Sequence, residues 1–123
     1  MGNWFLRIAV LYIIAGVGLG IYMGASGNHA LFPLHAHLNL LGWVAMSLFG
    51  LFYRVIPAAA ESTLAKVHFW IYVPANFAQM VLLAVVLRGN AALEPALGLF
   101  STLVGAAFIC FAVLVWRHTG KAA

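Results

Sequence analysis

Four long apolar runs constrain this chain more than any other feature of its sequence. They cover residues 4–25, 33–56, 64–87 and 95–116, and each is long enough to cross the hydrocarbon core of a bilayer, which takes about 20 helical residues. Hydrophobic residues make up 66% of the chain and charged residues only 7%. A soluble domain of 123 residues cannot bury so much apolar surface. The sequence therefore predicts an all-α membrane protein in which residues 1–123 form a single domain of four transmembrane helices.

Proline and polar residues indicate where these helices begin and end. Pro33 suits the first turn of a helix, where its missing N–H costs nothing. Pro57 is predicted to end the same helix, because proline cannot continue the backbone hydrogen bonds. Ser62 or Thr63 can cap the helix that follows.

Glycines give the first helix one distinctive face. Gly16, Gly20 and Gly24 recur every four residues and so lie on the same side of a helix. Small residues at this spacing let another helix approach closely. They predict a packing seam, either with a helix of the same chain or with a second copy; the alternative is that they reflect only the ordinary tolerance of glycine in a membrane helix.

Lysine and arginine are unevenly divided between the two sides of the predicted bundle. Arg88 alone falls on one side, and five basic residues fall on the other: Arg7, Arg54, Lys66, Arg117 and Lys121. Since cytoplasmic segments carry the excess of basic residues, both termini are predicted to be cytoplasmic, in a bacterial inner membrane. Tyr53 and Arg54 are expected to be anchors at the cytoplasmic interface. The basic residues are scattered, so the net charge of +4 does not indicate nucleic-acid binding.

Two histidines, His35 and His37, lie near the start of the second apolar run. An ionisable side chain in a membrane segment is costly and marks a candidate functional site, and imidazole is the commonest side-chain ligand of metals, including haem iron. Two helical positions are about 200° apart around the axis. The two side chains are therefore expected to point in different directions and cannot hold one ion together. His29, in the preceding loop, is a third candidate metal ligand.

The other histidines and the single cysteine are expected to be structural. His68, near the start of the third run, is predicted to be an interfacial histidine bonded to a neighbouring backbone group, and His118 a solvated residue of the tail. Cys110 alone can form neither an internal disulfide nor a cysteine-based zinc site. The sequence has no Cys-x-x-Cys-His motif, which excludes covalent c-type haem attachment.

A low-spin haem needs two axial ligands, and one chain offers a single well-placed inward histidine at the level of His37. Met80 and Met23 are weaker candidates for the second ligand. The alternative is the same histidine pair of a second copy, which predicts a homo-oligomer.

Three stretches resemble parts of the catalytic subunit of haem–copper oxidases and nitric oxide reductases. The first, His35-Ala36-His37-Leu38-Asn39-Leu40-Leu41-Gly42-Trp43-Val44, resembles the His-x-His helix of the cbb3-type and nitric oxide reductase branches. The second, Ala65-Lys66-Val67-His68-Phe69-Trp70, resembles the opening of the family's next helix. The third, Leu87-Arg88-Gly89, falls where the family has arginines that hold haem propionates. The resemblance covers the second and third runs, and the first and fourth only by topology.

This resemblance implies a protein that binds haem b. In the family the first histidine of the pair ligates the high-spin haem and the second the low-spin haem. Carried over, His37 is the low-spin ligand and His35 a candidate ligand of a second haem. Asn39 and Trp43 belong to the same motif and are expected beside the cofactor, with Arg88 on the propionates.

The resemblance also implies a form of assembly. The family's large subunit has twelve helices in three arcs of four, so a homotrimer of this chain would reproduce the same number. The copper site of the family, with three further histidines and in most members a cross-linked tyrosine, has no counterpart here. Oxygen or nitric oxide reduction is therefore not implied by the residues present.

Four functions follow as alternatives. The first is a haem-b membrane protein for electron transfer, haem handling or gas sensing, with a quinol or a cytochrome as electron donor. The second is a copper or zinc protein that uses His29, His35 and His37. The third is a small subunit or assembly factor of a respiratory complex, without a cofactor. The fourth is an enzyme, a minimal gas reductase.

Overall fold

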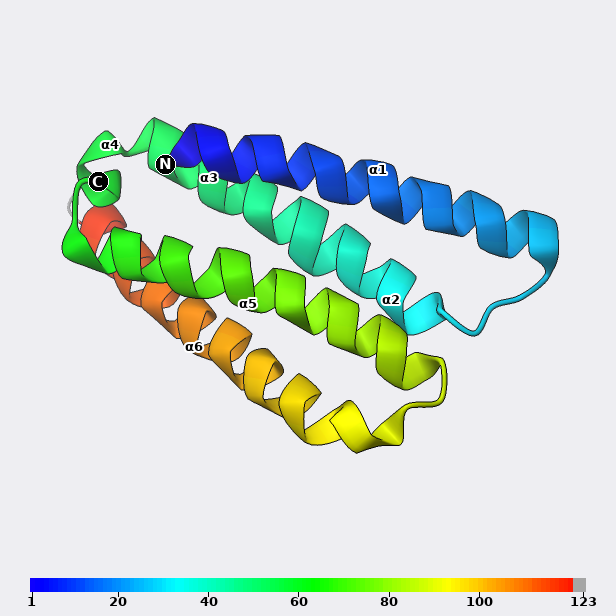
Figure 1. Ribbon diagram of the computed structural model, residues 1–123. Coiled ribbons are helices and arrows are strands. Elements are labelled where there is room, and N and C mark those ends of the chain that lie inside the picture. Colours follow the sequence, from blue (N-terminus) through cyan, green and yellow to red (C-terminus); the bar gives the residue numbers. More distant parts are fainter. Residues whose placement is uncertain (121–123) are drawn as a thin grey trace.

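The computed structural model describes residues 1–120, and over this range the regular structure is entirely helical. Four helical rods pack along one another (Figure 1). The first is α1 (Gly2–Ser26), and the third and fourth are α5 (Thr63–Leu87) and α6 (Glu94–Thr119). All four rods are long and apolar enough to span a membrane. The prediction of an all-α integral membrane protein with four such helices is confirmed.

The second rod is built from three consecutive pieces. It begins with α2 (Phe32–His37), continues as a π-helix, η1 (Leu38–Val44), and ends as α3 (Ala45–Val55). The sequence predicted one uninterrupted helix here. The π-helix was not predicted, because apolar periodicity does not distinguish i→i+5 from i→i+4 hydrogen bonding.

Short elements connect the rods at their ends. Ile56 leaves the helical conformation with φ −124° and ψ 76°, and Pro57 follows it, as predicted. A short helix, α4 (Pro57–Ala60), then leads to Ser62, whose hydroxyl oxygen accepts a hydrogen bond from the backbone N–H of Ala65 at 3.1 Å. This confirms the predicted cap of α5. A single 3₁₀ turn, η2 (Ala91–Leu93), precedes α6.

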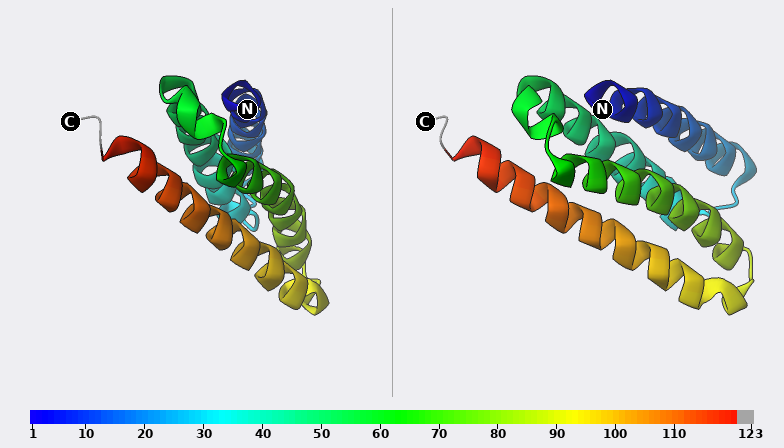
Figure 2. Two further views of the ribbon diagram at one scale, coloured as in Figure 1. Left: turned by 90° about the vertical axis from the view of Figure 1, so that its left-hand side faces the viewer. Right: turned by 60° about the vertical axis from the view of Figure 1, so that its left-hand side comes forward.

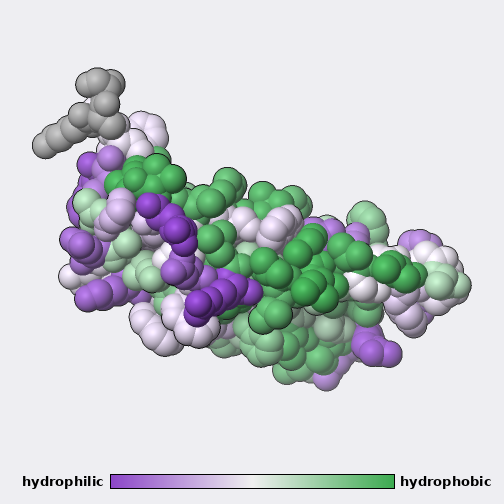
Figure 3. Space-filling view, turned by 90° about the horizontal axis from the view of Figure 1, so that it is seen from above, coloured by the Kyte–Doolittle hydropathy of each residue, from purple (hydrophilic) through white to green (hydrophobic). Residues whose placement is uncertain are grey.

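The two ends of the bundle are distinct. We name the end that holds the N-terminus, α4 and Gly120 the terminal end, and the end formed by the loops 27–31 and 88–90 the distal end (Figure 1). Apolar side chains cover much of the molecule's length between them in Figure 3. That distribution is typical of a protein whose middle lies in lipid.

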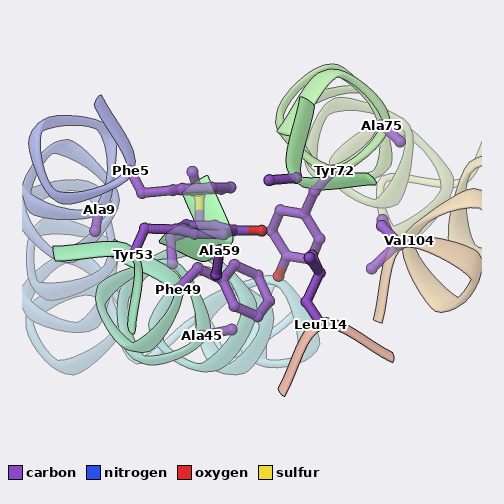
Figure 4. Close-up of a cluster of buried hydrophobic side chains, with 13 residues drawn as sticks. Phe5, Ala9, Ala45, Phe49, Tyr53, Ala59, Tyr72, Ala75, Val104 and Leu114 are labelled. Carbon is purple, nitrogen blue, oxygen red and sulfur yellow. The ribbon is translucent and has the colours of Figure 1, made fainter. Parts of the chain in front are cut away.

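Aromatic side chains fill the core toward the terminal end. Phe5, Phe49, Tyr53 and Tyr72 are almost fully buried there, between α1, α3 and α5 (Figure 4). The prediction that Tyr53 is an interfacial anchor is wrong, because its side chain is only 2% exposed. Its ring stacks on Phe5, with the ring centroids 5.8 Å apart, and its hydroxyl has a partner inside the core.

The glycine face of α1 packs within the chain. A Cβ atom at Gly16 would collide with Oδ1 of Asn39, and one at Gly20 would lie 2.9 Å from Cε1 of His35. A Cβ atom at Gly24 would meet nothing within 4 Å. Of the two alternatives for the seam, the structure therefore supports packing of α1 on α2 and η1 through two of the three glycines.

The last rod crosses the bundle obliquely, as Figure 2 shows. α6 packs along α5, and toward the terminal end its Phe108 and Phe111 also contact Phe49 of α3. Toward the distal end α6 runs beside α5 and away from α2 (Figure 2). This arrangement leaves one side of α2 facing the membrane.

Candidate cofactor site

The His37 ring is fixed by a hydrogen bond to its own helix. Its Nδ1 lies 2.7 Å from the carbonyl oxygen of Pro33. A carbonyl only accepts, so Nδ1 carries the proton, and the neutral ring has its lone pair on Nε2. Among residues 1–120 no group forms a hydrogen bond with this Nε2. The helix thus orients an imidazole whose free nitrogen is available to a ligand from outside the chain.

A shallow pocket opens beside this ring. Its volume is about 260 Å³, and it is lined by Ala36, His37, Leu40 and Leu41. The Leu40 side chain is 61% exposed, so the pocket faces the lipid. Ligand pockets usually hold about 300–1,000 Å³. One chain therefore offers one wall of a site here and does not enclose it.

The His35 ring points the other way, into the interface with α1. Its Nδ1 donates a hydrogen bond to the carbonyl oxygen of Gly16 at 2.8 Å, and its Nε2 accepts one from Nδ2 of Asn39 at 3.3 Å. The two histidines lie on different sides of the helix, as their spacing predicts. Both nitrogens of His35 are occupied within the chain, so a ligand role for His35 requires Asn39 to move.

The remaining motif residues lie apart from the His37 pocket. Oδ1 of Asn39 is buried beside Gly16, and the half-buried Trp43 packs against the aromatic core. His29 is exposed in its loop, with Nδ1 3.1 Å from the carbonyl oxygen of Gly27. Within residues 1–120 no three His, Cys, Asp or Glu side chains come close enough to hold a metal ion. A site made of His29, His35 and His37 together is therefore not assembled in one chain.

Arg88 is at the distal end but lines a different pocket from the one beside His37. That pocket has a volume of about 410 Å³, and its polar lining residues are Tyr22, Asn28 and Arg88. It shares no lining residue with the pocket beside His37. The structure thus places the predicted propionate contact and the predicted iron ligand on two separate surfaces of one chain.

The sequence prediction for His68 is wrong. The side chain is fully buried, and Nδ1 lies 2.8 Å from the Tyr53 hydroxyl, not beside a backbone group. The rings of Phe5, Phe49 and Phe111 surround it, with the Phe49 centroid 4.5 Å away. Its Nε2 is buried without a partner in the described part of the chain. The aromatic core therefore encloses this histidine completely.

A periodic signal could have revealed this environment. His68, Tyr72, Asn76 and Gln79 recur at helical spacing, and all four face the interior of the bundle. The Tyr72 hydroxyl donates to the carbonyl oxygen of Leu41 inside the π-helix at 2.7 Å. Nε2 of Gln79 donates a hydrogen bond to the Ser101 hydroxyl at 3.0 Å. We name these four residues the polar face of α5.

Comparison with models of protein families, with curated proteins and with solved structures finds no match to this chain. The resemblance to haem–copper oxidases thus depends on the quoted motifs alone and stays a prediction. The sequence and the structure together show four helices that can span a membrane and, in the second rod, a partly exposed His37 whose ring is oriented by its own helix.

Proposed function

We propose that this protein binds haem b, with Nε2 of His37 as an axial ligand of the iron. One observation carries the proposal, namely the bond from Nδ1 of His37 to the Pro33 carbonyl oxygen. Histidines that ligate metals almost always donate their other ring N–H to a carbonyl or carboxylate, which fixes the tautomer and makes the ligating nitrogen more basic. His37 is held in this way before any ligand arrives.

The surroundings of His37 suit a porphyrin. Ala36, Leu40 and Leu41 give the pocket an apolar wall that can pack on a macrocycle and exclude water from the iron. Bound haem supplies one-electron transfer or gas binding. The protein's part is to orient the imidazole and to set the polarity around it. Electron transfer or haem and gas binding is therefore the proposed role, with a quinol or a cytochrome as the electron donor.

A second copy is proposed to complete the site. The pocket beside His37 is smaller than ordinary ligand pockets and open to lipid, and the neighbouring His35 is engaged by Gly16 and Asn39. A symmetric oligomer supplies another His37 without further sequence. We favour a trimer, which would give the twelve helices that the motif resemblance implies.

The proposed orientation places both termini in the cytoplasm of a bacterial cell. Arg7, Arg54, Lys66 and Arg117 belong to the terminal half of the structure, whereas Arg88 is at the distal end; Lys121 lies outside the described residues. The positive-inside rule favours the terminal side as cytoplasmic. In a Cys110→Ala background, a Ser26→Cys variant should react with an impermeant maleimide added to intact spheroplasts. Labelling only after lysis would contradict this orientation.

The optical spectrum of the purified protein tests haem binding. We expect a Soret band and sharp α and β bands after reduction, and their loss in His37→Ala. His118→Ala is the matched control, because His118 also bonds an i−4 carbonyl, that of Leu114 at 2.9 Å, yet is expected to leave the spectrum unchanged. A normal spectrum in His37→Ala would remove His37 from the iron. Absence of any Soret band after expression with added haem would favour a cofactor-free subunit.

Native mass spectrometry in mild detergent tests the oligomer. We expect haem to accompany a multimer of the chain. A monomer that carries six-coordinate haem would contradict the shared site and would direct attention to Met80, Met23 or His29 as the second ligand.

A further inference from the structure

Two pockets follow one another along the line between α1 and α5. The outer pocket is at the distal end, where Arg88 lines it, and has a volume of about 410 Å³. The inner pocket is midway along the bundle, has a volume of about 310 Å³, and is lined by apolar side chains besides Tyr12. Two of its lining residues, Leu11 and Phe77, are 66% and 64% exposed. The inner pocket therefore opens sideways into lipid.

Helical spacing joins the two pockets into one groove. On α1, Ala15 lines the inner pocket, and Leu19, one turn later on the same face, lines the outer one. On α5, Met80 lines the inner pocket, and Leu87, two turns later, lines the outer one. Leu19 and Leu87 both pack on the buried cluster that contains Leu38 of the second rod. The groove thus has an apolar surface that continues from one pocket to the other.

The outer pocket presents hydrogen-bond donors. Its polar lining residues are Tyr22, Asn28 and Arg88, and all three are exposed. Oδ1 of Asn28 accepts a hydrogen bond from the backbone N–H of Ala30 at 3.0 Å, which leaves the amide N–H groups of Asn28 to donate elsewhere. The Arg88 and Tyr22 side chains form no hydrogen bond within residues 1–120. A ligand from outside the chain can therefore reach three donor side chains here.

The charge of the outer pocket favours an anion. The chain has only two acidic side chains: Glu61 lies between α4 and α5, and Glu94 begins α6. Neither of them lines the pocket, so Arg88 has no carboxylate beside it there. A guanidinium group binds phosphate oxygens through two parallel N–H···O bonds. The counter-ion that this pocket lacks is thus well matched by a phosphate group.

The length of the groove indicates what carries that phosphate. Tyr22 is near the distal end of α1, and Tyr12 precedes it by about ten residues, which is about 15 Å along a helix. This length is half of the roughly 30 Å hydrocarbon core. A phospholipid of one leaflet has its phosphate at the interface and an acyl chain that reaches the midplane. A soluble anion would use the outer pocket alone.

We propose that the groove between α1 and α5 binds one phospholipid with an anionic headgroup, taken from the distal leaflet. The phosphate accepts from the Arg88 guanidinium, and Tyr22 and Asn28 donate to neighbouring headgroup oxygens. One acyl chain lies over Leu19 and fills the inner pocket. A zwitterionic headgroup binds more weakly, because its ammonium group finds no carboxylate in the pocket. The proposal does not depend on haem at His37, whose pocket shares no lining residue with the groove.

Native mass spectrometry of the full chain in mild detergent tests the headgroup contact. The protein is titrated with phosphatidylglycerol or with phosphatidylcholine of identical acyl chains, and we expect tighter binding of the first. Arg88→Gln should weaken phosphatidylglycerol binding about fivefold, equivalent to about 1 kcal/mol, and remove the preference between the two lipids. Arg117→Gln is the matched control, because Arg117 is also exposed but belongs to the last turn of α6, at the terminal end. Its affinity should equal that of the original protein.

A ring placed in the inner pocket tests the position of the acyl chain. Ala15 is exposed, so Ala15→Phe should leave the fold intact, and it should weaken binding of both lipids about fourfold, the value of one buried methylene. Val17→Phe is the control, because Val17 is exposed on a different side of α1 and lines another shallow pocket. Thermal unfolding of each variant without added lipid verifies that the fold is kept.

Three results would overturn the proposal. The first is an equal affinity for the two headgroups in the original protein, and the second is an affinity unchanged by Arg88→Gln or by Ala15→Phe. The titration is also repeated in His37→Ala, where lipid affinity should be unchanged whether or not the original protein binds haem. Displacement of the lipid from this variant by added haem is the third, and it would assign Arg88 to the haem propionates.

Discussion

His37 and His68 are both within helices that can span a membrane, but the chain surrounds them differently. His68 is enclosed by aromatic rings from α1, α3 and α6 and bonds the Tyr53 hydroxyl. His37 bonds only a carbonyl of its own helix and borders a pocket open to lipid. His68, whose surroundings come entirely from one chain, is suited to stabilising the fold. His37, which borders an open pocket, is suited to binding a ligand that a second copy of the chain also contacts.

The course of α6 explains much of this difference. Near the terminal end its aromatic residues reach α3 and help to close the core around His68. Near the distal end α6 runs beside α5 and away from α2 (Figure 2). The same helix thus contributes to a closed half and leaves an open half, and the predictions below test that division in order of expected effect.

Substitution of His37 should affect haem binding, whereas substitution of His68 should affect stability. His37→Ala should lower haem affinity by more than about tenfold, with little change in unfolding temperature. Loss of a residue that only hydrogen-bonds a metal ligand already lowers metal affinity by about tenfold or more. His68→Leu should keep the haem spectrum but leave the Tyr53 hydroxyl without its partner, at a cost of about 1–3 kcal/mol. Haem titration and thermal unfolding in detergent measure the two effects. If His68→Leu abolished the spectrum as well, the proposed division of roles would fail.

A bulky residue where η1 packs against α1 should be poorly tolerated. A Cβ atom at Gly42 would collide with the ring of Tyr12, so Gly42→Leu should destabilise the fold by about 3 kcal/mol. Gly24→Leu is the control, because a Cβ atom there meets nothing within 4 Å. Unfolding by denaturing detergent compares the two variants. Equal destabilisation would show that Gly24 is also packed in the native assembly.

Removal of one hydroxyl should distinguish a buried tyrosine from an exposed one. Tyr53→Phe leaves a nitrogen of His68 without its partner and should cost about 1–2 kcal/mol. Tyr22→Phe should cost almost nothing, since Tyr22 is 54% exposed. The difference in unfolding midpoint is the measurement. Two equal midpoints would mean that the Tyr53–His68 bond adds no net stability.

The smallest effect is expected at Arg88. This side chain is exposed and borders a pocket separate from that of His37, and exposed ion pairs contribute about 0–1 kcal/mol. Arg88→Ala should therefore lower haem affinity less than about fivefold, with a small shift of the midpoint potential. A loss as large as that of His37→Ala would place Arg88 in the haem site of the assembled protein.

Much of the architecture follows from local sequence. The four apolar runs predicted the four rods, Pro57 the end of α3, and Ser62 the cap of α5. The opposite directions of His35 and His37 followed from their spacing alone. These features depend on length, hydropathy and the geometry of a single helix, which are properties of neighbouring residues.

Only the tertiary structure decided which polar groups meet. The partners of His35 and His68 are 19 and 15 positions away in the chain, at Gly16 and Tyr53. Local pattern cannot specify such pairs, because they depend on how the rods turn and approach one another. For the same reason the sequence identified His37 as a candidate ligand, but the packing of the rods determined that it, and not His35, has a free nitrogen at the lipid-facing surface.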